Sequence, residues 1–358
     1  MRKYYTRPCN FFYGNEAKKL IKKKIAFPLA GKSNIAFDQI EIIYRKQKRL
    51  SKSEILPITE VKFLNKEKSI SVQKDLKNIT TKRKNIAGLN FDKPKIMGVL
   101  NMTPDSFSEN GLFFDKTKSF DHTKFMINSG ADIIDIGGES TRPGSNSVDE
   151  KVEWLRVKNN ILNVKKEFPG IVVSLDTRKS YVMKKGIESK VNIINDVSGL
   201  SFDKNSLSTI SSKKIPFILN HMKGKTETMQ KNPKYDDVIL DIYDFFENKI
   251  NLCIKKKLNK NLIILDPGIG FGKNLKHNLR IISKISLFHS LGCPILIGTS
   301  RKRFIEHIVT KFDTPDRTGG TLASVLYGLS QGVQLFRVHN VKEINQGILV
   351  FNKILNTN

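Results

Sequence analysis

The sequence contains few of the residues that stabilise secreted or membrane proteins. Its 358 residues include only three cysteines, Cys9, Cys253 and Cys293, which lie far apart and lack metal-ligand spacing. Thiols placed in this way indicate free cysteines in a reducing compartment, so we expect a cytoplasmic protein. No apolar run approaches the length that spans a bilayer, and the N-terminal MRKYYTRPCN lacks the apolar segment of a secretory signal. We therefore expect no membrane partner.

Acidic residues are scarce as well. The chain has 34 Asp and Glu against 62 Lys and Arg, which gives a formal net charge of +28. Residues 1–93 alone hold 23 Lys and Arg against 8 Asp and Glu. Because no zinc finger, helix-turn-helix or RNA-recognition pattern occurs, we interpret the excess as a lysine-rich solvated surface and expect no nucleic-acid partner.

The chain divides into two regions of different character. Residues 1–93 are basic, contain few glycines and include strand-like pieces at 25–29 and 39–44, and their polar end from Thr80 to Lys93 suggests a linker. We expect a small accessory domain that packs on the rest of the chain. A basic arm that docks a partner or an acidic substrate is the alternative.

Residues 94–358 show a regular alternation of strand-like and helix-like segments. The helix-like segments include Asp236 to Leu258, whose apolar residues recur every three or four positions. Eight short apolar runs have the length of buried strands: 96–100, 132–136, 171–175, 192–195, 216–219, 262–265, 294–297 and 333–338. This pattern predicts an α/β fold, a (β/α)8 TIM barrel preceded by the small N-terminal region. A doubly wound open sheet is the alternative, although no glycine-rich dinucleotide turn follows the first strand.

Polar side chains follow almost every one of these runs. In a barrel of this kind the carboxyl ends of the strands form the site. The residues at those ends are Asn101, Gly137 to Arg142, Asp176, Asn195 and Asp196, Asn220 to Met222, Asp266, Gly298 to Lys302, and Arg337 with His339. Their convergence on one mouth predicts a binding site there.

Each of these residues alone has a simpler structural explanation. Asp176 and Asp266 could cap helices, and Asn195-Asp196 could form an Asx turn. The glycine-rich DPGIGFGK resembles a phosphate loop but lacks the Ser or Thr that should follow Lys273. The histidines are not spaced as zinc ligands.

Taken together, the residues have a chemical logic. Two carboxylates and an amide suit a flat heterocycle with several N–H donors, because a carboxylate accepts paired hydrogen bonds from such a ring. Arginine, lysine and histidine cations with Asn101 suit a phosphorylated group and its Mg²⁺, which prefers oxygen ligands. We therefore expect a ring pocket beside an anion pocket.

The motifs that carry these residues closely resemble those of dihydropteroate synthases. They occur in the family's order over residues 95–345: VLNMTPDSFS, ADIIDIGGESTRPGS, SLDT, NIINDVSGL, HMKG with TMQ, LDPGIGFGK, GTSRK and RVHNV. The resemblance implies condensation of a dihydropterin methyl diphosphate with p-aminobenzoate to give 7,8-dihydropteroate and pyrophosphate, in an enzyme that sulfonamides target. It also implies Mg²⁺ as the cofactor and a homodimer.

The resemblance also assigns roles by position. Asp176, Lys302, Arg337 and His339 would be the catalytic residues, and Asn101 would contact the metal. Asp176, Asn195, Asp266, Lys302 and Arg337 would hold the pterin. The residues implied around p-aminobenzoate are Phe107, Thr141, Arg142, Pro143, Phe271 and Ser300. Loops 101–115 and 140–149 would close over the substrates.

Two other functions share parts of this pattern. A corrinoid-linked pterin methyltransferase would use the same barrel but would be expected to lack GTSRK and RVH, both of which are present. A catalytically silent pterin- or nucleic-acid-binding protein is suggested by the basic charge and by the altered loop, Glu109-Asn110 where Asp-Gly is usual. Two further departures from the family pattern are Asn220 and Asn340, the latter where Asp is usual. None of these departures removes a matched binding residue.

Overall fold

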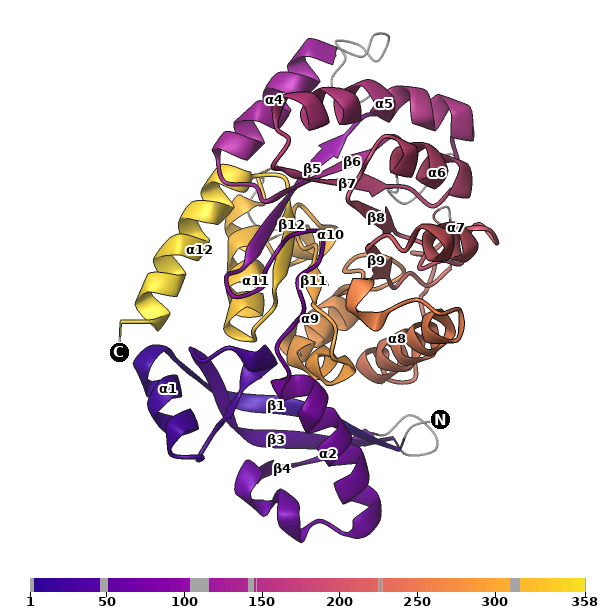
Figure 1. Ribbon diagram of the computed structural model, residues 1–358. Coiled ribbons are helices and arrows are strands. Elements are labelled where there is room, and N and C mark those ends of the chain that lie inside the picture. The colour runs from indigo at the N-terminus through magenta and orange to yellow at the C-terminus, as the bar shows by residue number, and fades with distance from the viewer. Residues whose placement is uncertain are drawn as a thin grey trace.

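The computed structural model describes residues 3–45, 51–103, 116–140, 145, 147–224, 226, 228–309 and 316–357. Its two parts are a small α/β region at the N-terminus and a larger barrel above it (Figure 1). Within the described residues, no helix has the length and apolar character needed to cross a bilayer.

The barrel contains the eight predicted strands, each within a residue or two of its expected run. They are β5 (Lys95–Asn101), β6 (Ile133–Gly137), β7 (Val172–Asp176), β8 (Ile193–Asp196), β9 (Phe217–Asn220), β10 (Ile263–Asp266), β11 (Leu296–Ile297) and β12 (Leu335–Val338). All pairings are parallel, in the order β10-β9-β8-β7-β6-β5-β12-β11. A parallel bridge between Leu265 and Ile295 joins the two ends, so the sheet is nearly closed into a barrel and the open-sheet alternative is wrong.

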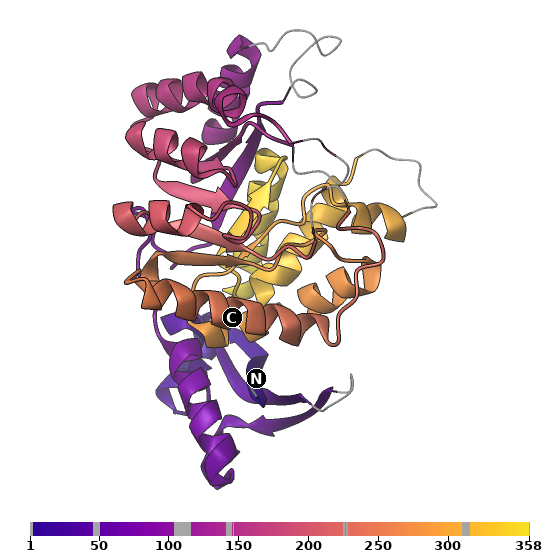
Figure 2. The same cartoon turned by 90° about the vertical axis from the view of Figure 1, so that its right-hand side faces the viewer.

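Helices surround the barrel, as the alternation predicted (Figures 1 and 2). They are α4 (Lys116–Asn128), α5 (Glu150–Glu167), α6 (Ser180–Glu188), α7 (Ser206–Lys213), α8 (Val238–Lys255), α9 (Leu275–Ser283), α10 (Arg303–Ile308), α11 (Thr318–Ser330) and α12 (Val341–Leu355). Short 3-10 helices occupy Lys260–Leu262 (η3) and Ile285–Leu291 (η4). The helix expected over Asp236–Leu258 is α8, and the Asp237 side chain caps it by accepting from two backbone N–H groups.

The strands alternate between two environments because successive side chains point to opposite faces. Ile96, Ile134 and Val173 face outward and pack under the helices in the main core. The residues next to them along the strands, Met97, Ile133 and Val172, face inward and form a separate apolar cluster. Two residues further along β6 and β7 the inward side chains become polar, so the barrel interior changes from apolar at its base to polar at its mouth.

The segment expected to be a simple linker also closes the base of the barrel. Ile86, Leu89 and Phe91 are at most 9% exposed and pack against the inward cluster that begins with Met97. Ile86 and Leu89 also form a two-residue bridge. This segment is therefore part of the barrel core, although its composition is polar and basic.

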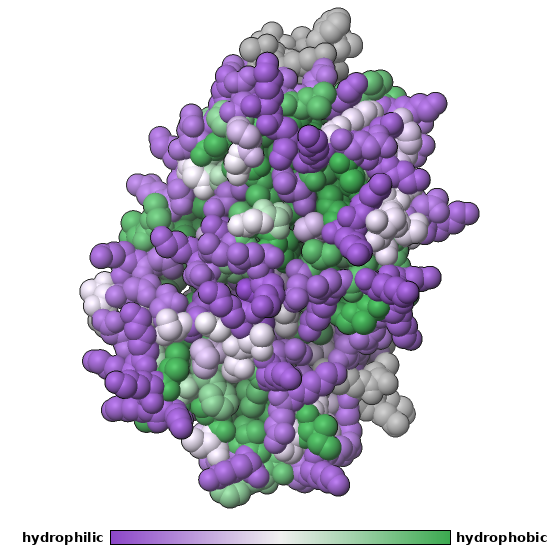
Figure 3. All heavy atoms as spheres, viewed as in Figure 1, coloured by the Kyte–Doolittle hydropathy of each residue, from purple (hydrophilic) through white to green (hydrophobic). Residues whose placement is uncertain are grey.

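The N-terminal part forms an antiparallel sheet with two helices. Its elements are β1 (Tyr4–Tyr13), α1 (Gly14–Lys22), β2 (Phe27–Pro28), η1 (Leu29–Gly31), β3 (Ile35–Arg45), β4 (Ser51–Pro57), η2 (Ile58–Phe63) and α2 (Lys66–Thr80). Strand β3 lies at the centre, with β1 on one side and β2 and β4 on the other. Of the two strand-like pieces expected, one is β3 and the other contains the short β2, whereas β1 and β4 were not predicted. The surface shown in Figure 3 is largely hydrophilic, in keeping with the lysine content.

Candidate functional site

The carboxyl ends of the barrel strands bring the predicted carboxylate of Asp176, the Asn195 amide and the Arg337 guanidinium together with a further carboxylate, that of Asp135. The Arg337 side chain, at the end of β12, donates from Nε to Oδ2 of Asp135 at 2.7 Å and from Nη2 to Oδ2 of Asp176 at 2.9 Å. Asn195 donates from Nδ2 to the same Asp135 oxygen at 3.0 Å. Side chains from four different strands therefore form one hydrogen-bonded group inside the barrel.

The register of the strands explains why these residues meet. Asn101 pairs with Gly137, Gly137 pairs with Asp176, and Asp176 pairs with Asn195 across β5 to β8. Paired residues of a parallel sheet point to the same face, here the barrel interior. Gly137 contributes no side chain to this row, and a Cβ there would come within 3.2 Å of the Asp176 Cβ.

Asp135 is a site residue that the sequence analysis missed. It is fully buried in the middle of β6, where an apolar side chain is the usual choice. Its position two residues before Gly137 places it on the inward face, and the strand alternation alone could have identified it. The other oxygen of Asp135, the hydroxyl of Ser174 and the amide oxygen of Asn220 are buried without a hydrogen-bond partner. Unsatisfied polar atoms of this kind are expected where a ligand binds.

A third carboxylate and an amine lie at the ends of other barrel strands. Asp266 ends β10 and accepts from the Gly268 N–H at 2.8 Å. Gly298 separates Asp266 from Arg337: a Cβ on this glycine would lie 4.0 Å from Oδ2 of Asp266 and 3.8 Å from the Cβ of Arg337. The Lys302 amine lies 4.1 Å from the centre of the Phe271 ring. Five of the residues expected to hold the pterin, Asp176, Asn195, Asp266, Lys302 and Arg337, thus surround the same space.

Burial sets the protonation behaviour of these groups. It lowers the pKa of Lys302 to about 8, and the Arg337 charge acts in the same direction while Asp266 and Asp176 oppose it. It also raises the pKa of Asp266. Burial and the Asp135 carboxylate together raise the pKa of Asp176, against the attraction of Arg337.

His339 and Ser300 form a separate pair at the end of β12. The Ser300 hydroxyl lies 3.0 Å from Nδ1 of His339 and 3.1 Å from its backbone N–H, which donates to it. Asn340, which replaces the usual Asp, accepts two hydrogen bonds from the Arg301 guanidinium, at 2.8 and 3.1 Å. The amide therefore retains the contact geometry but does not neutralise the Arg301 charge.

The simpler structural explanations hold for some residues and fail for others. Asp196 does form the Asx turn, since it accepts from the Ser198 N–H and hydroxyl. Asp176 does not cap a helix, because it binds Arg337 and α6 begins at Ser180. The cap of α9 is Asn274 rather than Asp266.

Lys273 of the glycine-rich loop does not point into the mouth. Its amine is buried and donates to the carbonyls of Gly268, Phe271 and His221 at 2.9 to 3.2 Å, and it lies 3.0 Å from Nδ1 of His221. Lys273 therefore braces the loop, and its amine is not directed toward a ligand in the mouth.

A buried ion cluster that sequence reasoning did not anticipate stands behind the loops of the mouth. Glu139 accepts from Arg178 and Lys179, both at 2.9 Å, and Lys179 also binds Glu153. Glu139 additionally accepts from the Val148 N–H at 2.8 Å. The cluster therefore ties the far end of the loop that follows β6 to the end of β7.

Several predicted residues lie outside the described part of the chain. They are Phe107, Thr141, Arg142 and Pro143 of the expected p-aminobenzoate pocket, together with the departure Glu109-Asn110. Of that pocket the structure describes Phe271 and Ser300. Among the described residues no group of three or more His, Cys, Asp or Glu side chains is arranged to hold a metal ion.

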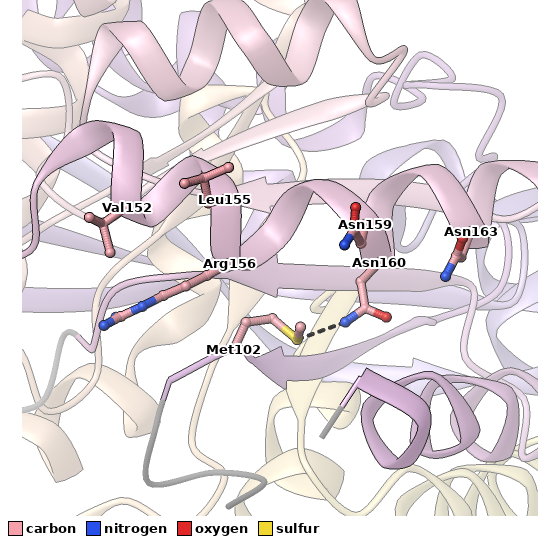
Figure 4. A pocket seen from close by; sticks show the side chains of 7 residues that line it. All are labelled: Met102, Val152, Leu155, Arg156, Asn159, Asn160 and Asn163. Atoms are coloured by element: carbon pink, nitrogen blue, oxygen red, sulfur yellow. Dashed lines mark hydrogen bonds between the residues drawn. The ribbon is translucent and has the colours of Figure 1, made fainter. Parts of the chain in front are cut away.

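A pocket of about 470 Å³ lies away from these residues, against α5 (Figure 4). Met102, Val152, Leu155 and three asparagines line it, and among the described residues Arg156 is the one charged side chain in its lining. Asn160 lies across it with Nδ2 3.0 Å from the Met102 sulfur. It contains none of the convergent polar groups of the mouth, so the mouth remains the candidate site.

Comparisons with known proteins agree with this geometry. The sequence profile described as "Pterin binding enzyme" matches residues 97–339. Dihydropteroate synthase of Escherichia coli is 38% identical over 267 residues, which cover 75% of this chain and 94% of that protein. The Bacillus subtilis enzyme is also 38% identical over 267 residues, covering 74% of this chain and 90% of that protein.

Solved structures give the same result. The Yersinia pestis dihydropteroate synthase, determined with a sulfonamide drug complex, matches with a TM-score of 0.70 and 36% identity, covering 74% of this chain and 96% of that one. The Xanthomonas albilineans enzyme in complex with 7,8-dihydropteroate matches with a TM-score of 0.66 and 30% identity, covering 74% and 95%. This chain therefore belongs to the pterin-binding enzyme family and, within it, to the dihydropteroate synthases.

Proposed function

We propose that the barrel mouth joins a dihydropterin methyl diphosphate to p-aminobenzoate. The bond between the methylene carbon and the diphosphate oxygen breaks, the arylamine nitrogen forms the new bond to that carbon, and the amine loses a proton. The products are 7,8-dihydropteroate and pyrophosphate. The observation that carries this proposal is the buried group of Asp135, Asp176, Asn195 and Arg337 at the carboxyl ends of the barrel strands.

The pterin end of the site is built from hydrogen-bond acceptors. Asp176, Asp266 and the Asn195 amide suit the N–H groups of the ring, and a carboxylate that meets two such donors forms a strong paired contact. Negative charge at Asp176 would also stabilise a methylene cation that develops as the diphosphate leaves. Arg337, held flat between Asp135 and Asp176, offers a planar cation that can stack on the ring.

The diphosphate end of the site is built from cations and neutral donors. Strands β12 and β5 are neighbours in the sheet. Arg337 lies near the end of β12, His339 directly follows it, and Asn101 ends β5. The residues present fit Mg²⁺, because this ion keeps several waters and needs only one or two protein oxygens beside the substrate phosphates. Asn101 would hold it through the amide oxygen. When bound, Mg²⁺ would neutralise charge on the leaving diphosphate.

The direct test is a turnover assay. The purified chain with Mg²⁺, the dihydropterin methyl diphosphate and p-aminobenzoate is expected to release pyrophosphate and 7,8-dihydropteroate in equal amounts. A chain that binds the pterin but releases neither product would instead be a non-catalytic pterin-binding protein. The corrinoid-linked methyltransferase is disfavoured because such an enzyme binds no diphosphate. It would therefore not need the cations Lys302 and Arg337, which both lie at the mouth.

Lys302 gives the reaction a pH dependence. Its amine carries a proton below its pKa of about 8 and loses it above that value. If the charged amine contacts the ring edge, the KM for the pterin diphosphate is expected to rise as the pH increases through 8. A KM profile measured from pH 6.5 to 9.5 tests this, with Lys302→Arg as the control. The Lys302→Arg protein should keep its positive charge and show no inflection of the KM near pH 8. Identical KM profiles for the two proteins would show that the charge of Lys302 does not contribute to binding the pterin diphosphate.

The assembly and compartment are part of the same proposal. Helix α12 presents Leu349, Val350 and Ile354 with more than half of each exposed, which supports a homodimer formed through outer helices. Sedimentation velocity that shows a monomer at micromolar concentration would contradict it. Three free, buried cysteines support a reducing compartment, the cytoplasm, which localisation of a tagged chain would test.

A further inference from the structure

The N-terminal part packs along one side of the barrel, yet the family profile begins only at Met97. In Figure 2 its violet strands extend beneath the orange helix α8. Contacts to Lys284, Ser286 and Ser330 help to hold it. There are also two other sets of contacts. One is at the base of the barrel, where Asn78 donates to the Ser290 carbonyl at 2.8 Å and Arg83 donates to that of His289 at 3.0 Å. The other lies along the first half of α8.

The contacts on α8 are specific and partly buried. Arg45, at the end of β3, donates to Asp241 and Asp244, each at 2.9 Å, and its side chain is 14% exposed. The Tyr5 hydroxyl donates to Asp244 at 2.8 Å, and its ring packs edge-on against Tyr243. Because Asp241 and Asp244 are three residues apart, they lie on one face of the helix, and a single guanidinium spans both.

A further contact reaches the start of α8 itself. The Ser51 hydroxyl donates to Oδ2 of Asp237 at 2.6 Å, while Oδ1 of Asp237 accepts from the Ile239 and Leu240 N–H groups. The N-terminal part therefore contacts the residue that caps the helix. Asp241 is shared in the same way, because its other oxygen accepts from the Asp236 N–H at 3.0 Å.

Asp236 ends the loop that connects β9 to α8, and this loop packs against the glycine-rich loop that follows β10. Tyr235 donates to the Gly272 carbonyl at 2.9 Å, and Gln230 donates to that of Gly270. The two backbones lie so close that a Cβ on Gly272 would come within 2.2 Å of the Lys223 carbonyl oxygen. The two loops are therefore packed directly against each other.

The loop after β10 follows Asp266 of the proposed pterin pocket and carries Phe271 of the expected p-aminobenzoate pocket. Asp266 precedes it and is fixed by the Gly268 N–H, and Phe271 lies under the Lys302 amine. A series of hydrogen bonds and peptide links thus runs from Arg45 through Asp241, Asp236 and Tyr235 to the loop after β10. Each link joins groups that lie next to one another in the chain or in space.

We propose that the N-terminal domain is a clamp that holds the end of the β9 loop, residues 228–236, and through it positions Asp266 of the pterin pocket and Phe271 of the p-aminobenzoate pocket. Arg45 is the main positioning residue of this clamp. The inference rests on the proposed function for its kinetic consequence, whereas the ordering of the loop does not depend on it.

Arg45→Met in the full chain is the principal test. It keeps the length of the apolar stem and removes the guanidinium, so Asp241 and Asp244 lose their ion pairs while the Tyr5 and Ser51 contacts remain. We expect about a 5-fold rise in the KM for the pterin diphosphate with kcat changed less than about 2-fold, a coupling of typical size. Hydrogen exchange of residues 228–236 should become about 10-fold faster.

Three companion variants sharpen the result. Arg45→Lys can reach only one of the two aspartates and should give an intermediate KM. Tyr235→Phe breaks the link nearest the mouth and should raise the same KM while exchange within α8 stays as in the wild type. Asn78→Ala removes a contact at the base and should leave both the KM and loop exchange unchanged.

The outcomes separate the clamp from the function. Faster loop exchange in Arg45→Met but not in Asn78→Ala supports the clamp even if the wild-type chain makes no dihydropteroate, in which case the proposed function alone fails. An unchanged loop and KM in a folded Arg45→Met protein would overturn the clamp. Equal effects of Arg45→Met and Asn78→Ala on the KM and on loop exchange would also overturn the clamp. They would show that the N-terminal domain only stabilises the barrel as a whole.

Discussion

Asp176→Asn is expected to reduce kcat by about 10²- to 10³-fold, the range found when one charge-stabilising group is removed from an active site. The amide has the same shape as the carboxylate, so the barrel should fold normally. It lacks the negative charge that would stabilise a developing pterin cation, and it presents an N–H group where Arg337 already donates at 2.9 Å. Steady-state kinetics with thermal unfolding measured on the same sample tests this.

Asp203→Asn is a suitable control for this result. Asp203 accepts from the Ser180 N–H at the start of α6 and lies away from the group around Arg337. Its substitution should alter the melting temperature slightly and leave kcat near the wild-type value. Wild-type turnover in a well-folded Asp176→Asn protein would contradict the role assigned to Asp176.

Phe91→Ala is expected to lower the free energy of unfolding by about 3–5 kcal/mol, the usual cost of deleting a buried aromatic side chain. Phe91 is 3% exposed and fills the base of the barrel against the inward residues that begin the strands. Its removal would leave a cavity that the eight strands cannot close without shifting. Urea unfolding followed by circular dichroism measures the change.

Phe63→Ala is the matched comparison. Phe63 is 77% exposed, so its removal should change the free energy of unfolding by less than about 0.5 kcal/mol. Similar effects from the two substitutions would show that the segment before β5 does not close the barrel. A chain that begins at Pro94 would lose Ile86 and Leu89 as well, and we expect it to aggregate.

Much of the barrel could be predicted because its information is local. Each strand is a short apolar run bounded by polar or glycine residues, and this pattern follows from burying a strand on both faces. The positions of Asp176, Asn195 and Asp266 followed from the same pattern, since each ends such a run. The motif GTSRK placed Lys302 and Ser300 in the same way.

The residues that were missed depend on distant parts of the chain. Asp135 lies inside an apolar run, and its purpose is apparent only when Arg337, 202 residues later, donates to it. The sequence did not show what Lys273 contacts, because its partners are the carbonyls of its own loop and of the distant His221. Ile86 and Phe91 lie in a basic segment. Their packing partners are the inward side chains of the barrel strands, which come together only in the folded barrel.

Local patterns in the chain were enough to specify the number, order and type of the barrel elements and the chemical character of the mouth, because hydrophobic periodicity and strand-end residues are local properties. The contacts among the polar groups, the closure of the base and the attachment of the N-terminal domain became apparent only in the folded chain. The attachment depends on Arg45 meeting Asp241 and Asp244, residues about 200 positions apart in the chain. No local pattern specifies such a pairing, since its geometry exists only once both surfaces have folded.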